Sequence, residues 1–318
     1  MKIITKLLPS LSLKLAVVSM ISVQAIGFLP SVPTTSRAYA AEPAALVPSA
    51  PTAAPATKAT WVWYTAEAFK NLDVTFNQMQ ANGINLVYLQ QDVDIPNDKY
   101  AAFIKRANSL GIEVHALAGE PNWVLPEKQI KMYKFIDWVK NYNLSVKPDE
   151  RYKGIHLDVE PFTTKEWRDD QDKMLGYWRD TVTGFVQETK LETGLPTGAD
   201  IPFWLHKFTV PDGHGGRYTL SKFMISQFDI TTLMAYRDNT REIIDVASNE
   251  LNEAEALGKP LLLSVETLQN PDSFITFYGK GKKKLNMEMG DLNQNLKNRK
   301  AYKGYAVHEF SAWTKMED

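Results

Sequence analysis

Short apolar runs alternate with longer amphipathic stretches along the chain from residue 61 to the C-terminus. The apolar runs have the length and the β-branched and aromatic content of buried strands. There are eight of them, at 61–64, 84–90, 112–118, 154–160, 198–203, 230–236, 260–266 and 304–310. The stretches between them follow the period of a helix, most clearly at 101–110, 126–142, 165–193 and 240–257.

This alternation predicts an α/β fold, a single (β/α)8 TIM barrel. Near-continuous apolar strands are typical of a parallel sheet covered by helices. Gly83, Gly111 and Gly258 stand where a helix would turn tightly into the next strand. An open doubly wound sheet is the alternative, but no glycine-rich phosphate loop follows the first run. Because the chain ends soon after the eighth run, we expect the last helix to be short or missing.

The first 40 residues are set apart from the fold by their own pattern. Basic residues precede an apolar run over 15–29, and small residues on both sides of Tyr39 form a cleavage position. This order predicts a secretory signal peptide that is cleaved after about Ala40. An uncleaved anchor is the alternative, although the run is shorter than the roughly 20 residues of a spanning helix. We therefore expect a secreted or cell-envelope protein, on the extracellular side, that has no membrane segment after cleavage.

The composition of the remaining chain excludes several classes of function. Residues 41–60 are rich in Ala, Pro and Thr and predict a disordered linker, which leaves 61–318 as the barrel domain. The signal peptide carries four basic and no acidic residues, so its removal changes the formal net charge from −1 to −5. A mildly acidic chain is not expected to bind nucleic acid. Since cysteine is absent, a cysteine nucleophile and a thiolate metal site are excluded. We predict no metal and no cofactor, and we expect a monomer.

The fourth predicted strand carries the strongest signal for chemistry. Successive side chains of a strand point to opposite faces. In 154–160, His156, Asp158 and Glu160 therefore share one face, while the other face is apolar and suits packing under the helices. An imidazole and two carboxyls in a row inside a barrel are costly unless function requires them. A buried structural network is the alternative explanation.

Polar and aromatic residues also gather near the ends of the other predicted strands, where the active sites of parallel barrels form. Together with His156 on the fourth strand, the candidate substrate-binding residues are Trp63, Gln90, Glu120, Asp200, Trp204, Met234, Arg237, His308 and Trp313, with Tyr236 and Glu266 as candidate catalytic residues. Aromatic faces stack on the apolar faces of sugar rings, so the mixture favours a carbohydrate substrate.

The fourth and sixth strands resemble family-18 glycoside hydrolases, the chitinases and related endo-N-acetylglucosaminidases. That family's strand-four signature is Asp-Gly-x-Asp-x-Asp-x-Glu, and Gly154, Asp158 and Glu160 match it. Its sixth strand ends in Met-x-Tyr, which Met234 and Tyr236 match. The resemblance implies a TIM-barrel glycosidase, with specific matches in these two strands alone.

The resemblance also implies roles for the matching residues. Glu160 would be the general acid, and Asp158 would raise its pKa and orient the N-acetyl group of the substrate, which replaces an enzyme nucleophile. Tyr236 would hydrogen-bond the same acetamido group. The chain departs from the family pattern where His156 and Arg237 replace aspartates. The tryptophan expected on the eighth strand falls near His308 or is displaced to Trp313.

A second glycosidase mechanism fits the strand ends. Many retaining barrel glycosidases place an acid/base Glu after strand four and a nucleophile Glu after strand seven, the positions of Glu160 and Glu266. Such carboxyls lie about 5–5.5 Å apart. Two other classes stay open. The histidines at 115, 156 and 308 with nearby acids would suit a metal-dependent hydrolase, although no close His pair exists. A tethered, non-catalytic sugar-binding barrel is the other.

Overall fold

The barrel closes through eight parallel strands in the computed structural model, which describes residues 56–318. Neighbouring strands follow the order β1-β10-β9-β8-β5-β4-β3-β2, and β1 pairs with both β10 and β2. The strands are β1 (Thr57–Val62), β2 (Leu86–Gln90), β3 (Glu113–Ala118), β4 (Gly154–Leu157), β5 (Thr197–Pro202), β8 (Ile230–Met234), β9 (Leu261–Glu266) and β10 (Tyr302–His308). This closed order confirms the predicted barrel and excludes the open sheet.

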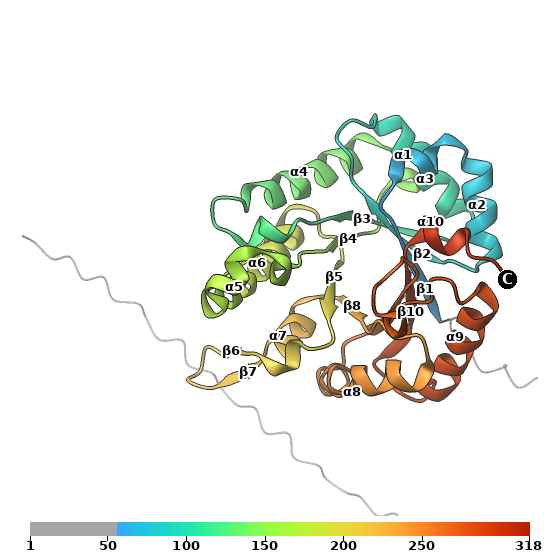
Figure 1. Ribbon diagram of the computed structural model, residues 1–318. Helices are drawn as coiled ribbons and strands as arrows, with labels where there is room; N and C mark the ends of the chain where they lie inside the picture. Colours follow the sequence, from blue (N-terminus) through green and yellow to red (C-terminus); the bar gives the residue numbers. More distant parts are fainter. Residues whose placement is uncertain (1–55) are drawn as a thin grey trace, which may run out of the picture. The chain divides into compact units, whose positions relative to one another are not determined.

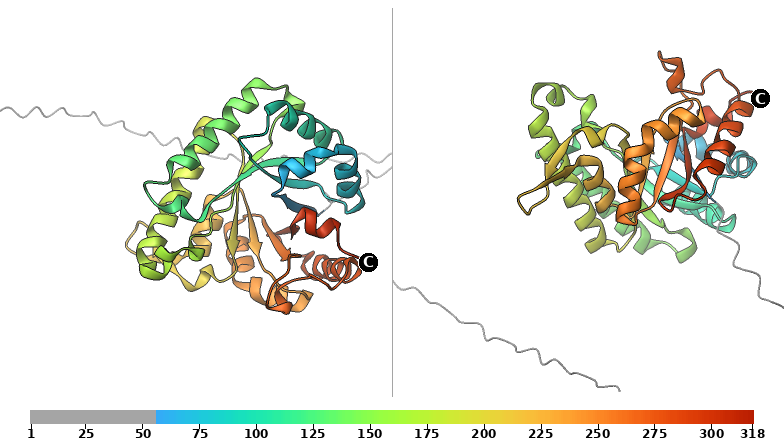
Figure 2. Two further views of the ribbon diagram at one scale, coloured as in Figure 1. Left: turned by 45° about the horizontal axis from the view of Figure 1, so that its top comes forward. Right: turned by 90° about the horizontal axis from the view of Figure 1, so that it is seen from below.

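Helices lie on the outside of the strands (Figure 1), and the turned views in Figure 2 agree. The α-helices are α1 (Thr65–Lys70), α2 (Leu72–Ala81), α3 (Asn97–Ser109), α4 (Ile130–Ser145), α5 (Lys165–Asp169), α6 (Gln171–Glu192), α7 (Leu220–Gln227), α8 (Thr240–Leu257), α9 (Lys282–Leu296) and α10 (Phe310–Thr314). The 3-10 helices are η1 (Pro121–Val124), η2 (Pro148–Glu150), η3 (Pro161–Thr163), η4 (Leu205–Lys207) and η5 (Ser273–Ile275). A hairpin of β6 (Thr209–Pro211) and β7 (Arg217–Thr219) follows β5. As predicted, the last helix is short.

Several predicted boundaries are wrong, and three of them bear on the arrangement of the barrel. The first strand starts at Thr57, inside the segment assigned to the linker, because Thr57–Thr60 find partners in β10. The fourth strand ends at Leu157, since the chain turns into η3 at Pro161. The helix predicted over 165–193 breaks at Asp170, whose side chain caps the start of α6. The predicted signal peptide and most of the linker lie outside the described residues.

The two faces of β4 divide as the period of two predicts. Ile155, Leu157 and Val159 belong to the apolar layer between the strands and the helices. His156 instead lies inside the barrel, where its ring stacks on Tyr88 with 3.8 Å between centroids. The barrel therefore presents Asp158, two residues beyond His156, at its C-terminal end.

None of the helices within residues 56–318 is both long and apolar enough to cross a bilayer.

Candidate active site

A cavity of about 290 Å³ opens at the C-terminal ends of the barrel strands. Its lining contains four carboxyls, three aromatic or imidazole rings and a thioether, namely Trp61, Asp158, Glu160, Asp200, Met234, Tyr236, Glu266 and His308. These residues come from six strands or the turns that follow them, so only barrel closure brings them together. Besides Asp158 and Glu160, twelve substrate-binding and catalytic residues were predicted from the sequence, and five of the twelve line the cavity: Asp200, Met234, Tyr236, Glu266 and His308.

Asp158 and Glu160 lie in the turn between β4 and η3, with their carboxyls in the cavity. Burial raises the pKa of Glu160 to about 7, and the nearby charge of Asp200 adds to this effect. Burial also raises the pKa of Asp158 well above its usual value. The nearby charges of Asp200 and Glu160 raise it further. The Oδ1 atom of Asp158 is buried and has no hydrogen-bond partner among residues 56–318. Near neutral pH the carboxyls of Asp158 and Glu160 therefore retain protons to a greater extent than free carboxyls do.

Asp200 forms the floor of the cavity from β5. Its Oδ2 accepts a hydrogen bond of 2.9 Å from Nε1 of Trp61. Burial raises the pKa of Asp200 to about 8 against the opposing effect of this bond. His156 lies within 3.0 Å of the same carboxylate, but without hydrogen-bond geometry. Burial lowers the pKa of His156 to about 3, so this ring is neutral.

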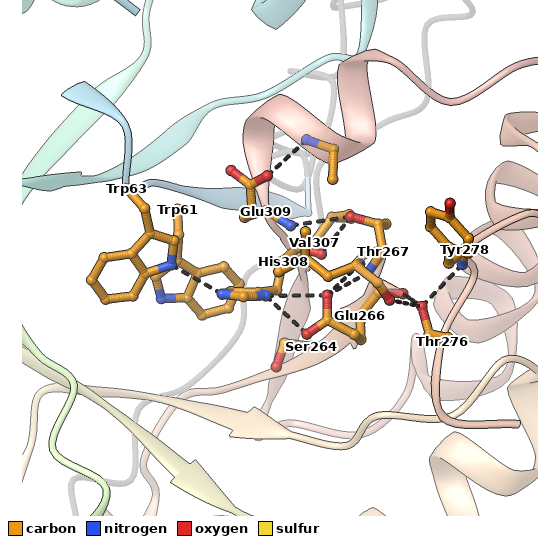
Figure 3. Close-up of polar contacts among 12 residues, drawn as sticks. Trp61, Trp63, Ser264, Glu266, Thr267, Thr276, Tyr278, Val307, His308 and Glu309 are labelled. Atoms are coloured by element: carbon orange, nitrogen blue, oxygen red, sulfur yellow. Dashed lines mark hydrogen bonds and ion pairs between the residues drawn. The ribbon is translucent and has the colours of Figure 1, made fainter. Parts of the chain in front are cut away.

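Glu266 stands in a different environment at the end of β9. Its Oε1 accepts hydrogen bonds of 2.7 Å from the backbone N–H groups of Thr267 and Leu268. Its Oε2 lies 3.0 Å from Nδ1 of His308. Figure 3 shows Glu266 at the centre of these contacts, with His308 and then Trp63 on one side. Two backbone N–H groups and the imidazole of His308 thus surround this carboxylate, and hydrogen bonds from N–H groups favour the charged form of a carboxyl group.

Tyr236 and Arg237 follow β8 and differ in direction. Tyr236 lines the cavity, and burial raises the pKa of its hydroxyl far above the usual value, so the phenol stays protonated. The guanidinium of Arg237 is packed between Phe203 and Phe274, at 5.0 and 5.4 Å from their ring centroids. It donates to the carbonyl of Tyr236. Arg237 does not line the cavity and instead fixes the loops beside it.

Two residues predicted to bind substrate are buried, and this corrects the prediction. His156 is fully buried beneath the cavity floor, between Tyr88 and Asp200. Trp313 is also fully buried, because it shares the inward face of α10 with Phe310. Neither ring can contact a sugar in this structure.

Three further predicted residues are not brought into the cavity. Trp204 packs edge-on against Phe162 and belongs to an aromatic cluster below the loops. Glu120 is paired with Lys131 of α4 at 2.8 Å. Gln90 ends β2 half-buried, outside the cavity lining. For these residues a position near a strand end was not sufficient.

Trp61 was missed by sequence reasoning. Once β1 is extended back to Thr57, the period of two places Ala59, Trp61 and Trp63 on the inner face. The pattern Trp-x-Trp at the end of the first run was the available signal. It was obscured because the strand was expected to start at Trp61 itself.

The metal-dependent alternative finds no support in the described part of the chain. Residues 56–318 contain no group of three or more His, Asp or Glu placed to hold a metal ion. His115 bonds Glu113 at 2.7 Å, at the other end of β3 from the cavity. Glu309 caps α10 through the backbone N–H groups of Ser311 and Ala312.

Comparisons with solved structures find a similar fold in several glycoside hydrolases. A chitinase from Bacteroides thetaiotaomicron superposes with a TM-score of 0.53 at 10% identity, over 81% of this chain and 91% of that chain. A family-18 chitinase from Cycas revoluta superposes with a TM-score of 0.48 at 11% identity, over 81% of this chain and 96% of that chain. A family-113 β-1,4-mannanase superposes with a TM-score of 0.48 at 10% identity, over 83% of this chain and 92% of that chain. At these identities the likeness is one of fold.

No family model matches the sequence, and no curated protein matches it either.

Proposed function

We propose that this protein is a glycoside hydrolase in which Glu160 is the general acid and Glu266 is its anionic partner. One observation carries the proposal: two carboxyls in one cavity stand in opposed environments. The pKa of Glu160 is raised to about 7, mainly by burial. Glu266 accepts three N–H hydrogen bonds, which favour its ionised form. Carboxyls with such opposed environments are the usual mark of an acid and its partner.

In this mechanism Glu160 gives its proton to the glycosidic oxygen as the bond to the anomeric carbon breaks. Glu266 attacks that carbon and forms a glycosyl ester. Glu160, now ionised, removes a proton from water, and the water oxygen displaces Glu266. The sugar is released with its configuration retained, and both carboxyls return to their starting states.

A second mechanism is supported by Asp158. Its Oδ1 is buried without a partner and lies in the same cavity as Tyr236. The two groups suit an acetamido substituent, which offers one N–H and one carbonyl oxygen. In this case the acetamido oxygen attacks the anomeric carbon, and Glu160 again donates the proton. The likeness in fold to a chitinase supports this alternative and an N-acetylhexosamine substrate.

The test is hydrolysis of a panel of glycans containing chitin oligosaccharides, peptidoglycan, N-glycans and β-mannan. Glu160→Gln keeps the shape of the side chain and removes the proton donor, so we expect the rate to fall about 10²–10⁴-fold. Glu166→Gln, on the exposed surface of α5, is the matched control and is expected to leave the rate unchanged.

The outcomes separate the candidate functions. Labelling of Glu266 by a 2-fluoro glycoside, detected by mass spectrometry, supports the two-carboxylate mechanism. Loss of activity in Asp158→Asn without such labelling supports the substrate-assisted one. If wild type and Glu160→Gln bind a glycan but are equally inactive on the whole panel, the protein is a sugar-binding barrel and the proposal is wrong.

The predicted signal peptide over residues 1–40 supports a site of action outside the cytoplasm. We therefore propose that the substrate is an extracellular or cell-envelope glycan. Fractionation of the producing cells, followed by N-terminal sequencing of the recovered protein, tests this localisation and the cleavage after about Ala40.

A further inference from the structure

A continuous chain of hydrogen bonds links three strand ends at one side of the cavity. Nε1 of Trp63, just beyond β1, donates to Nε2 of His308 at 3.0 Å. Nδ1 of His308, at the end of β10, lies 3.0 Å from Oε2 and 3.2 Å from Oε1 of Glu266. Figure 3 shows the three side chains in a row, with the imidazole between the indole and the carboxylate. The chain exists because β1 and β9 both pair with β10 in the closed barrel.

The indole decides which hydrogens the imidazole carries. An indole N–H is a donor and never an acceptor, so Nε2 of His308 must offer a lone pair to Trp63. The hydrogen of a neutral ring then sits on Nδ1, directed at Glu266. A protonated ring has N–H groups on both nitrogens, and its Nε2–H would face the N–H of Trp63. The bond from Trp63 and a positive charge on His308 therefore exclude each other.

The surrounding charges favour the opposite state of His308. Burial lowers the pKa of this imidazole, but the hydrogen bond and charge of Glu266, with the charges of Asp158 and Asp200, outweigh it and raise the pKa. Glu160 lies in the same cavity, and its own pKa responds to His308. The other neighbours, Trp61 and Tyr236, present uncharged rings. Among these neighbours, the N–H of Trp63 is the contact that favours the neutral ring.

We propose that Trp63 is a positioning residue that holds His308 in its neutral, Nδ1–H form and thereby leaves Glu266 with an uncompensated negative charge. This inference rests on the proposed function, in which Glu266 acts as the anion. A cationic His308 would pair with the carboxylate and reduce its reactivity toward an anomeric carbon. A neutral His308 orients the carboxylate through one hydrogen bond and leaves its charge available.

The variant Trp63→Phe tests this role, because phenylalanine keeps an aromatic ring and removes the N–H donor. In wild-type protein, nitrogen NMR of the imidazoles should show His308 with its hydrogen on Nδ1; His308→Gln identifies the signal. In Trp63→Phe the neutral ring loses one hydrogen bond, so protonation of His308 should become about threefold to tenfold more favourable. Its titration midpoint therefore moves to higher pH. In wild type, the indole N–H signal of Trp63 should change with the midpoint of His308.

Trp138→Phe on α4 is the matched control, since Trp138 stacks on Tyr142 in the outer layer. It should leave the titration of His308 unchanged. Thermal unfolding confirms that both variants are folded. The proposal is overturned if His308 carries its hydrogen on Nε2, or if its midpoint in Trp63→Phe is unchanged or lower. The titration needs no turnover, so failure to cleave any glycan would refute the proposed function and leave this result standing.

Discussion

Burial and hydrogen bonding decide, residue by residue, which carboxyl of the cavity keeps a proton. Glu160 is half-buried with no side-chain hydrogen bond among the described residues, and its pKa rises to about 7. Glu266 is more deeply buried, yet backbone N–H groups and the imidazole of His308 form hydrogen bonds with its carboxylate. The two groups are the same chemical type, and the less buried one lacks the hydrogen-bond donors that surround the other. Exposure alone would therefore assign the acid to the wrong residue.

The variant Asp200→Asn should move the basic limb of the pH–rate profile to lower pH. A general acid works while protonated, so the rate falls as pH rises through the pKa of Glu160. Asp200 titrates in the same range, with a pKa of about 8, and its ionised form opposes the ionisation of Glu160. Removing that charge should therefore let Glu160 ionise at lower pH. The amide oxygen can still accept from Trp61, which preserves the floor of the cavity.

The profile of kcat/KM against pH measures this shift, and Asp172→Asn on the exposed surface of α6 is the control. A limb that stays in place or moves upward would exclude the assigned electrostatic link between Asp200 and Glu160.

Among the elements, the contact between the ends of β3 and β4 sets the position of Asp158. Gly119 follows β3 directly, and a Cβ at this position would lie 1.5 Å from the carbonyl oxygen of Asp158 and 3.0 Å from its Cα. The backbone of the turn that carries Asp158 therefore occupies the space of a side chain. This close approach lets Asp158 donate its N–H to Ala118.

Gly119→Ala should both destabilise the protein and impair its activity. The added methyl group meets backbone, which cannot move without displacing Asp158, so we expect a loss of about 1–3 kcal/mol in the free energy of unfolding. Urea denaturation and glycan hydrolysis measure the two effects. Gly290→Ala is the matched control, since Gly290 lies within α9 with no atom within 4 Å of an added Cβ. There we expect a gain of about 0.5–1 kcal/mol. Equal effects of the two substitutions would contradict the role of Gly119.

The molecule as a whole depends on the meeting of its first and last strands. Thr57, Lys58, Ala59 and Thr60 are the residues of β1 that pair with β10. The hydroxyl of Thr60 also donates to the carbonyl of Val307 at 2.7 Å. The same closure brings Trp61 to Asp200 and Trp63 to His308. Both the closed barrel and the arrangement of the cavity therefore depend on the first strand.

Two truncated chains test this dependence. A chain that begins at residue 56 keeps every described strand and should unfold cooperatively at the temperature of the full-length protein. A chain that begins at Trp61 loses all the register partners of β10 on β1, so we expect the barrel to open and cooperative thermal unfolding to be lost. Calorimetry compares them. Indistinguishable transitions would show that residues 57–60 do not close the barrel.

The sequence by itself determined the class of fold and the position of two central carboxyls. Strand and helix periods are local properties, so eight alternating runs were enough to predict the barrel. The period of two likewise assigned His156, Asp158 and Glu160 to the inner face of one strand. The nearness of Glu266 followed from the parallel strand ends, which must meet at one rim.

The tertiary structure alone decided the environment of each group. Residues far apart in sequence, such as Trp63 and His308, become neighbours only when the barrel closes. The same packing buried His156 and Trp313, which sequence had placed against the substrate. Charge states were also undetermined by sequence, because a pKa depends on burial and on donors from other strands. The period of apolar and polar residues can be read from a short stretch of sequence, whereas the burial of a side chain depends on the closed barrel.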